Sequence, residues 1–170
     1  MIKNLNDMLN QLKGQDKVIL SVAAAEDKEV LIAIKDAVEK EIIKPILVGQ
    51  AEKICAIAKE INFNLVDIKI INSETIQESA RIAVQLVSNK EADFVMKGLL
   101  DTAVLLKEVL NKDYGLRTDS LLSHVMIYEL EKYHKLLLLT DGGMNIAQEK
   151  KKKEKILKNS IQAAKSLGIE

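Results

Sequence analysis

Apolar and polar positions follow two alternating periods along the first hundred residues. Short apolar runs, typical of buried strands, are separated by longer stretches in which apolar residues recur every three or four positions, as on one face of a helix. The pattern predicts strands over 17–22, 45–48, 67–71 and 92–96, and helices over 2–12, 26–41, 51–61 and 74–87. Strands that alternate with helices in this way are typical of a parallel α/β sheet.

Two local features refine this interpretation. Ser73 precedes the helix predicted over 74–87 and is expected to cap it, because a serine oxygen accepts from the free amides of a first helical turn. Cys55 falls in the apolar stripe of the helix predicted over 51–61. A cysteine on such a stripe is more often a buried structural thiol than a nucleophile.

The regular alternation of predicted strands and helices ends after Gly98. The pattern then predicts a helix over 102–110, a polar loop over 111–120, an edge or antiparallel strand over 121–130, a buried strand over 135–140, a loop over 141–148 and a helix over 149–166 that Gly168 ends. The whole chain is therefore expected to adopt an α/β fold of three layers, with a mostly parallel sheet flanked by helices.

Charge and composition exclude several classes of protein. The 170 residues carry 25 basic and 25 acidic side chains, so there is no net field to hold nucleic acid or a membrane surface. One cysteine allows no intramolecular disulfide, the N-terminus lacks the apolar core of a signal peptide, and no apolar run approaches the roughly 20 residues that span a bilayer. These features predict a cytoplasmic protein that binds neither nucleic acid nor membrane.

The first candidate binding group follows the predicted strand over 92–96. Lys97 and Gly98 come directly after the strand, and Thr102 begins the next helix. Ligands of open parallel sheets bind beyond the carboxyl ends of the strands, and a helix start with a lysine beside it suits an anion. A lysine that merely reaches solvent from the end of a strand is an equally good interpretation.

The second candidate group contains one of only two arginines in the chain. Arg117 and Thr118 are followed closely by Ser123 and His124, and a guanidinium with hydroxyl donors suits a phosphate. Asp119 allows the alternative of an ion pair with Arg117 in a solvated turn. The other arginine, Arg81, lies in a predicted helix and is expected on its surface.

The third candidate group is the loop that contains Asp141 and Asn145. It has neither the GxGxxG spacing of dinucleotide sites nor the GxxxxGK[ST] spacing of a P-loop. Asn145 suits either the orientation of an acyl or phosphate oxygen or an ordinary turn. Two isolated histidines and one cysteine lack the spacing of metal ligands, so no metal site is predicted. The lysine-rich run over 149–155 is expected to be the solvated face of a helix, or else to attract a polyanion.

Long segments of the chain resemble one family. The segments VMKGLLDTAVLLKEVL (95–110), YGLRTDSLLSHV (114–125) and LTDGGMNIA (139–147) are similar to the phosphate acetyl/butyryltransferases, most of all to the phosphate butyryltransferase branch, and VAAAEDKEVLIAIKDA (22–37) and PILVG (45–49) fit the same pattern. The resemblance implies one lobe of a two-lobed fold like that of the isocitrate and isopropylmalate dehydrogenases.

The activity that the resemblance implies is transfer of a short, butyryl-like acyl group between coenzyme A and orthophosphate, giving an acyl phosphate. It implies acyl-CoA and phosphate as substrates, no cofactor and no metal, and a homo-oligomer. Arg117 and Lys97 would neutralise phosphate, Thr118, Ser123 and Asn145 would donate hydrogen bonds, and Asp141 would orient its loop. Gly98, Thr102 and His124 complete the predicted substrate-binding set.

The resemblance also implies that residues 1–170 are the N-terminal α/β lobe of such an acyltransferase. The second lobe, with further acid/base and phosphate-binding residues, would be absent, so the catalytic residues stay unassigned and the chain is expected to be inactive alone, as a fragment or a natural half protein. Gln148 departs from the family, which usually has proline there. The alternatives are a phosphate acetyltransferase, or a non-catalytic α/β module that binds acyl-CoA or phosphate.

Overall fold

The computed structural model describes residues 2–146 and 149–168. The chain divides into two compact units. Residues 14–117 form the first, called here the parallel-sheet unit, and residues 1–13 with 118–170 form the second, called the hairpin unit. No helix among the described residues combines the length and the apolar character that crossing a bilayer requires.

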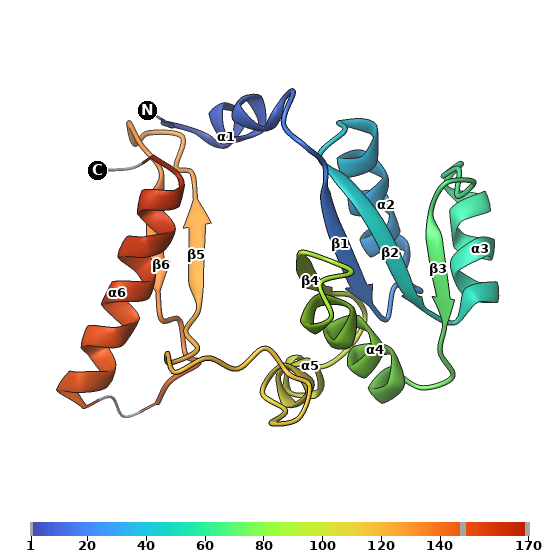
Figure 1. Cartoon of the computed structure of the whole chain (residues 1–170). Coiled ribbons are helices and arrows are strands. Elements are labelled where there is room, and N and C mark those ends of the chain that lie inside the picture. Colours follow the sequence, from blue (N-terminus) through green and yellow to red (C-terminus); the bar gives the residue numbers. More distant parts are fainter. Residues whose placement is uncertain (1, 147–148, 169–170) are drawn as a thin grey trace. The chain divides into compact units, whose positions relative to one another are not determined.

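The parallel-sheet unit alternates strand and helix throughout (Figure 1). Its elements are β1 (Val18–Ala23), α2 (Lys28–Glu39), β2 (Ile43–Gly49), α3 (Ala51–Glu60), β3 (Lys69–Asn72), α4 (Ile76–Ser88), β4 (Phe94–Lys97) and α5 (Thr102–Val109). The strand order is β3-β2-β1-β4, and every neighbouring pair is parallel. The predicted parallel α/β sheet is therefore confirmed for this unit.

Helices cover both faces of this sheet, so its central strands are apolar on both sides. Val22 and Leu47 pack on the face covered by α2 and α3, whereas their neighbours Ala23 and Val48 pack on the face covered by α4 (Figure 1). Successive side chains of a strand point to opposite faces, which is why adjacent residues enter different cores. Helix, sheet and helix form the three predicted layers.

A serine hydroxyl joins α4 to the ends of the two central strands. Ser79, fully buried on α4, accepts a hydrogen bond from the amide of Ala24 (2.7 Å) and donates one to the carbonyl of Val48 (2.9 Å). Ala24 has a φ of +51°, and its amide bonds this hydroxyl instead of a neighbouring strand. Ser79 therefore satisfies two backbone groups that burial would otherwise leave without a partner.

Two predictions about side chains in this unit are wrong. The cap of α4 is Thr75, whose Oγ1 accepts from the amide of Glu78 (3.1 Å), because the amide of Ser73 still bonds the carbonyl of Gly49 (3.0 Å) and keeps Ser73 with the sheet. Cys55 is exposed. The buried stripe of α3 runs through Ile54, and the next residue lies about 100° further round the helix.

Three helices of the unit end on residues with left-handed backbone. Glu41, Asn62 and Lys90 have φ values of 58°, 54° and 63° and follow the C-caps of α2, α3 and α4. Glycine is the usual residue at such a position, because a side chain there is strained.

Lys90→Gly is expected to stabilise the protein by about 1 kcal/mol, since glycine removes the left-handed strain at the end of α4. Lys90→Ala is the matched control, because alanine removes the lysine side chain but keeps the Cβ. The measurement is the free energy of unfolding in denaturant. Equal stabilities of the two variants would contradict the explanation.

The hairpin unit contains α1 (Leu5–Leu12), β5 (Val125–Tyr128), β6 (Leu137–Thr140) and α6 (Lys150–Ser166). β5 and β6 form an antiparallel two-stranded sheet, and α6 packs against β6. The antiparallel strand predicted over 121–130 is thus confirmed. The strand predicted over 135–140 is confirmed as β6, but its predicted burial is wrong, because Leu139 is 44% exposed. The lysine-rich run over 149–155 is exposed throughout, as expected of a solvated face.

Candidate functional site: two groups of polar residues

The first group lies at the end of β4 in the parallel-sheet unit. The Lys97 ammonium donates to the carbonyl of Leu100 (2.8 Å) and, at longer range, to that of Gly98 (3.4 Å). An ammonium has three donors, so one remains for a ligand. Thr102, the first residue of α5, is exposed, and the N-cap of this helix, Asp101, makes no side-chain capping bond. The structure therefore places Lys97, Gly98 and Thr102 on one short segment.

Gly98 is required by packing. Its amide donates to the carbonyl of Ala23 (2.8 Å), and the amide of Leu99 donates to that of Ala24 (2.9 Å). A Cβ on Gly98 would lie only 2.2 Å from the Ala24 oxygen and 2.5 Å from the Ala23 oxygen. The glycine thus lets the end of β4 approach the loop that follows β1.

Arg117 and Thr118 lie at the boundary between the two units. Arg117 is exposed, and no ion pair joins it to Asp119 within the described ranges 2–146 and 149–168, so the solvated-turn alternative lacks its central contact. Thr118 Oγ1 accepts from the amide of Ser120 (3.2 Å). Arg81 lies on the surface of α4, 51% exposed by its side chain, as predicted.

The second group lies in the hairpin unit, where Asp141 connects two segments. One oxygen of Asp141 accepts from the amide of His124 (3.1 Å), and the other accepts from the backbone amide (2.9 Å) and side-chain amide (2.6 Å) of Asn145. Thr140 Oγ1 donates to the carbonyl of His124 (2.8 Å). Three predicted site residues, His124, Asp141 and Asn145, are therefore joined by hydrogen bonds.

Ser123 belongs to the same group through a residue that sequence analysis missed. Asn145 Nδ2 also donates to the carbonyl of Leu122 (3.0 Å), and Asn159 of α6 donates to Ser123 Oγ (2.8 Å) and to the carbonyl of Leu121 (2.8 Å). Segment 121–124 is thus held from both sides. One feature of the sequence could have pointed to Asn159: asparagine is a poor helix former, yet it lies in the middle of the predicted helix. The prediction for Gln148 concerns a residue outside the described ranges.

The hydrogen bonds to Asp141 favour its charged form. The side-chain amide of Asn145, followed by the backbone amides of His124, Asn145 and Met144, lowers the pKa of Asp141 from its usual 3.8, against an opposing effect of desolvation. A group whose pKa is lower in the folded state stabilises that state above its unfolded pKa and loses this contribution as the pH falls.

The wild-type protein is therefore expected to lose more stability than Asp141→Asn when the pH falls below about 4. The measurement is the free energy of unfolding of both proteins between pH 6 and pH 3. If their difference in stability is the same at every pH, the bonds to Asp141 do not act through its charge.

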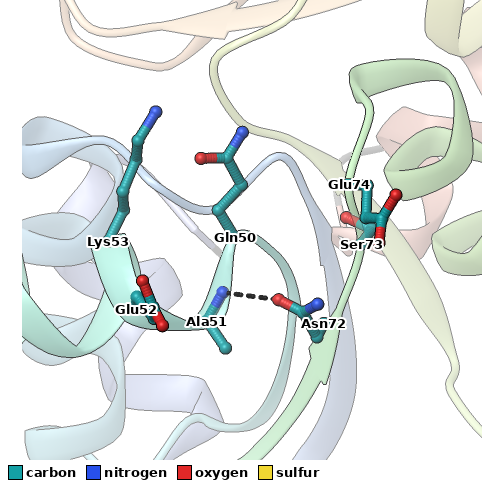
Figure 2. A pocket seen from close by; sticks show the side chains of 7 residues that line it. All are labelled: Gln50, Ala51, Glu52, Lys53, Asn72, Ser73 and Glu74. Carbon is teal, nitrogen blue, oxygen red and sulfur yellow. Dashed lines mark hydrogen bonds between the residues drawn. The ribbon is translucent and has the colours of Figure 1, made fainter.

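A groove of about 570 Å³ lies elsewhere in the parallel-sheet unit, where β2 and β3 end (Figure 2). Its lining consists of Gln50, Ala51, Glu52, Lys53, Asn72, Ser73 and Glu74. The lining carries two carboxylates, Glu52 and Glu74, and one ammonium, Lys53, and this balance of charge does not suit a phosphate. None of the predicted site residues lines this groove. The described part of the chain also holds no group of three histidine, cysteine or acidic side chains arranged for a metal ion.

Solved structures share this fold. A branched-chain phosphotransacylase from Enterococcus faecalis is similar at 28% identity with a TM-score of 0.74, covering 89% of this chain and 52% of its own. A phosphotransacetylase from Streptococcus pyogenes, at 18% identity, has a TM-score of 0.80, covering 98% of this chain and 60% of its own, and supports the fold alone.

Known sequences extend the similarity along the chain. A phosphate butyryltransferase from Clostridium acetobutylicum is 42% identical over all 170 residues, which is 56% of its length, and one from Clostridium beijerinckii matches equally. A phosphate acetyltransferase from Rickettsia felis is 35% identical over 94% of this chain and 46% of its own length. The chain thus spans about half the length of the curated relatives it matches. The family model described as "Phosphate acetyl/butaryl transferase" matches residues 4–82 and 73–170, and the chain belongs to this family.

Proposed function

We propose that this chain forms the N-terminal lobe of an enzyme that transfers a butyryl-like acyl group between coenzyme A and orthophosphate. The observation that carries the proposal is 42% identity, over all 170 residues, to two proteins named phosphate butyryltransferase. In the reaction a phosphate oxygen attacks the thioester carbonyl carbon, the carbon–sulfur bond breaks, and the CoA thiolate leaves and takes up a proton. The products are an acyl phosphate and free coenzyme A.

The two polar groups supply what this reaction needs from the N-terminal lobe. Arg117 and Lys97 neutralise the charge of phosphate, which has to be held against a thioester carbonyl. Thr118 and Ser123 donate hydrogen bonds to substrate oxygens. Two observations support the roles of Arg117 and Lys97. Arg117 is exposed and forms no ion pair among the described residues, and the Lys97 ammonium has a third donor that its two backbone bonds leave available.

Asp141 acts by orientation. Its hydrogen bonds to His124 and Asn145 fix the loop after β6 against segment 121–124. Asn145 uses both amide hydrogens on the Leu122 carbonyl and Asp141, so a bond from this amide to substrate requires exchange of one of them. Gly98 and Thr102 shape the segment that carries Lys97.

The remaining features of the proposal concern the whole enzyme. The complete fold is two-lobed, like the isocitrate and isopropylmalate dehydrogenases, and the general acid and base lie in the second lobe. The substrates are acyl-CoA and phosphate, and neither a metal nor a redox cofactor takes part. The enzyme is a cytoplasmic homo-oligomer that binds neither nucleic acid nor membrane.

A second candidate activity is phosphate acetyl transfer, because the relative from Rickettsia felis, named phosphate acetyltransferase, is 35% identical over 94% of the chain. The two activities use the same chemistry and differ in the length of the acyl group. A non-catalytic module that binds acyl-CoA or phosphate is the remaining alternative.

One assay separates these candidates. Release of CoA is measured from butyryl-CoA and from acetyl-CoA with phosphate, on this chain and on the longest open reading frame that contains it. Faster release from butyryl-CoA supports the butyryltransferase, and faster release from acetyl-CoA supports the acetyltransferase. Binding of CoA without release in either protein would overturn the catalytic proposal in favour of the binding module.

A further inference from the structure

Asn159 of α6 contacts segment 120–123 at three points. Its Nδ2 donates to the carbonyl of Leu121 (2.8 Å) and to Ser123 Oγ (2.8 Å), and its Oδ1 accepts from Ser120 Oγ at 3.4 Å. Both amide hydrogens are therefore used. Because a carbonyl can only accept, the atom of Asn159 at the Leu121 carbonyl has to be the donor Nδ2 and not Oδ1.

The identity of the residue agrees with this role. Asparagine is one of the poorer helix formers, yet Asn159 lies half-buried in the interior of α6, seven residues before the helix ends at Ser166. Most residue types would suit the helix better. The three hydrogen bonds to segment 120–123 give a physical reason for asparagine at this position.

The bond from Asn159 constrains the Ser123 hydroxyl. A serine hydroxyl has one hydrogen to donate and two lone pairs that accept. One lone pair is taken by Asn159, so the hydrogen has to point elsewhere. No acceptor for it is recorded among residues 2–146 and 149–168. The hydroxyl hydrogen is thus directed away from α6 and can donate to an oxygen of a ligand.

We propose that Asn159 is a positioning residue that holds the Ser123 hydroxyl as a hydrogen-bond donor to an oxygen of the bound phosphate. The inference rests on the proposed function, in which Ser123 is a substrate-binding residue. Asn159 itself does not touch substrate.

A double-mutant cycle tests this role. The variants are Asn159→Leu, Ser123→Ala and their combination, and the readouts are affinity for inorganic phosphate by calorimetry and the KM for phosphate in the CoA-release assay. We expect Asn159→Leu to weaken phosphate binding about tenfold, as loss of one oriented donor to a charged ligand does. In the Ser123→Ala background the same change should have no further effect, because there is no hydroxyl left to orient.

Asn159→Asp is the near-isosteric variant that separates orientation from packing. Its carboxylate would accept the Ser123 hydrogen and turn it away from the ligand, so phosphate affinity should fall by at least as much as in Asn159→Leu. Gln162→Leu changes an exposed residue of the same helix and should leave affinity unchanged.

The outcomes separate the inference from the function on which it rests. Wild-type affinity in Asn159→Leu, or the same loss in the presence and absence of the Ser123 hydroxyl, would overturn the positioning role while the function stands. A folded wild-type protein with neither phosphate binding nor CoA release, in this chain and in the longest reading frame alike, would overturn the proposed function and this inference with it.

Discussion

Arg117→Ala is expected to raise the KM for phosphate, or to lower kcat, by about 10- to 100-fold in a competent enzyme. One hydrogen bond to a charged group contributes about 1.5–3 kcal/mol, so the loss of even one bond from the guanidinium to phosphate corresponds to roughly this range. Arg117 is exposed and makes no recorded ion pair within the described part of the chain. Removal of its side chain should therefore weaken phosphate binding but change the free energy of unfolding little. The measurement is CoA release at varied phosphate concentration.

Two further substitutions make this result specific. Arg117→Lys keeps the charge but loses the planar pair of donors, so activity should lie between that of the wild type and that of Arg117→Ala. Arg81→Ala removes the only other arginine, from the surface of α4, and should leave the kinetics unchanged. An unchanged phosphate dependence in Arg117→Ala would remove Arg117 from the site.

Gly98→Ala is expected to destabilise the parallel-sheet unit by about 3 kcal/mol or more. The new methyl group would lie within 2.8 Å of three backbone atoms of Ala23 and Ala24, and backbone cannot move aside as a flexible side chain can. The melting temperature should fall by roughly 6–12 °C, at about 2–4 °C per kcal/mol for a chain of this size.

Gly142→Ala is the matched control in the other polar group. A Cβ there would lie 3.7 Å from His124 Nδ1, an ordinary contact, so its effect on stability should stay within about 0.5 kcal/mol. Thermal unfolding of the two variants gives the comparison. Equal melting temperatures would show that the segment after β4 relaxes around the added methyl group.

The parallel sheet was predictable because strands that are buried on both faces appear in the sequence as short, uninterrupted apolar runs. The run Ile46–Val48 is apolar without interruption, and the helices on either side show a regular stripe. The N-cap of α4 was predicted wrongly because two nearby residues are both suitable caps. Ser73 and Thr75 are both good caps by composition, and the choice depends on a backbone bond from Ser73 to Gly49 that pattern does not reveal.

The candidate site was predictable by residue type and only partly by arrangement. Glycines and polar residues after predicted strands pointed to Gly98 and Asp141, because ligands of parallel sheets bind where strands end. Gly98 does follow a strand of the parallel sheet, whereas Asp141 follows β6 of the antiparallel sheet. Asn159 contributes through one side chain on a helix that is distant in sequence from Ser123, so no local spacing identifies it. The pairing of β5 with β6 likewise depends on which strands lie side by side in the fold, and the period of apolar residues does not specify this.

The division of the chain into units also sets an order for folding during synthesis. The hairpin unit is built from both ends of the chain, with the amide of Leu5 bonded to Glu129, whereas the parallel-sheet unit is one continuous stretch inserted between them. Ribosomes add about 5–20 residues per second, so residues 14–117 emerge several seconds before the last helix is made. The parallel sheet can form in that interval, while α1 has to wait for its partners to be synthesised.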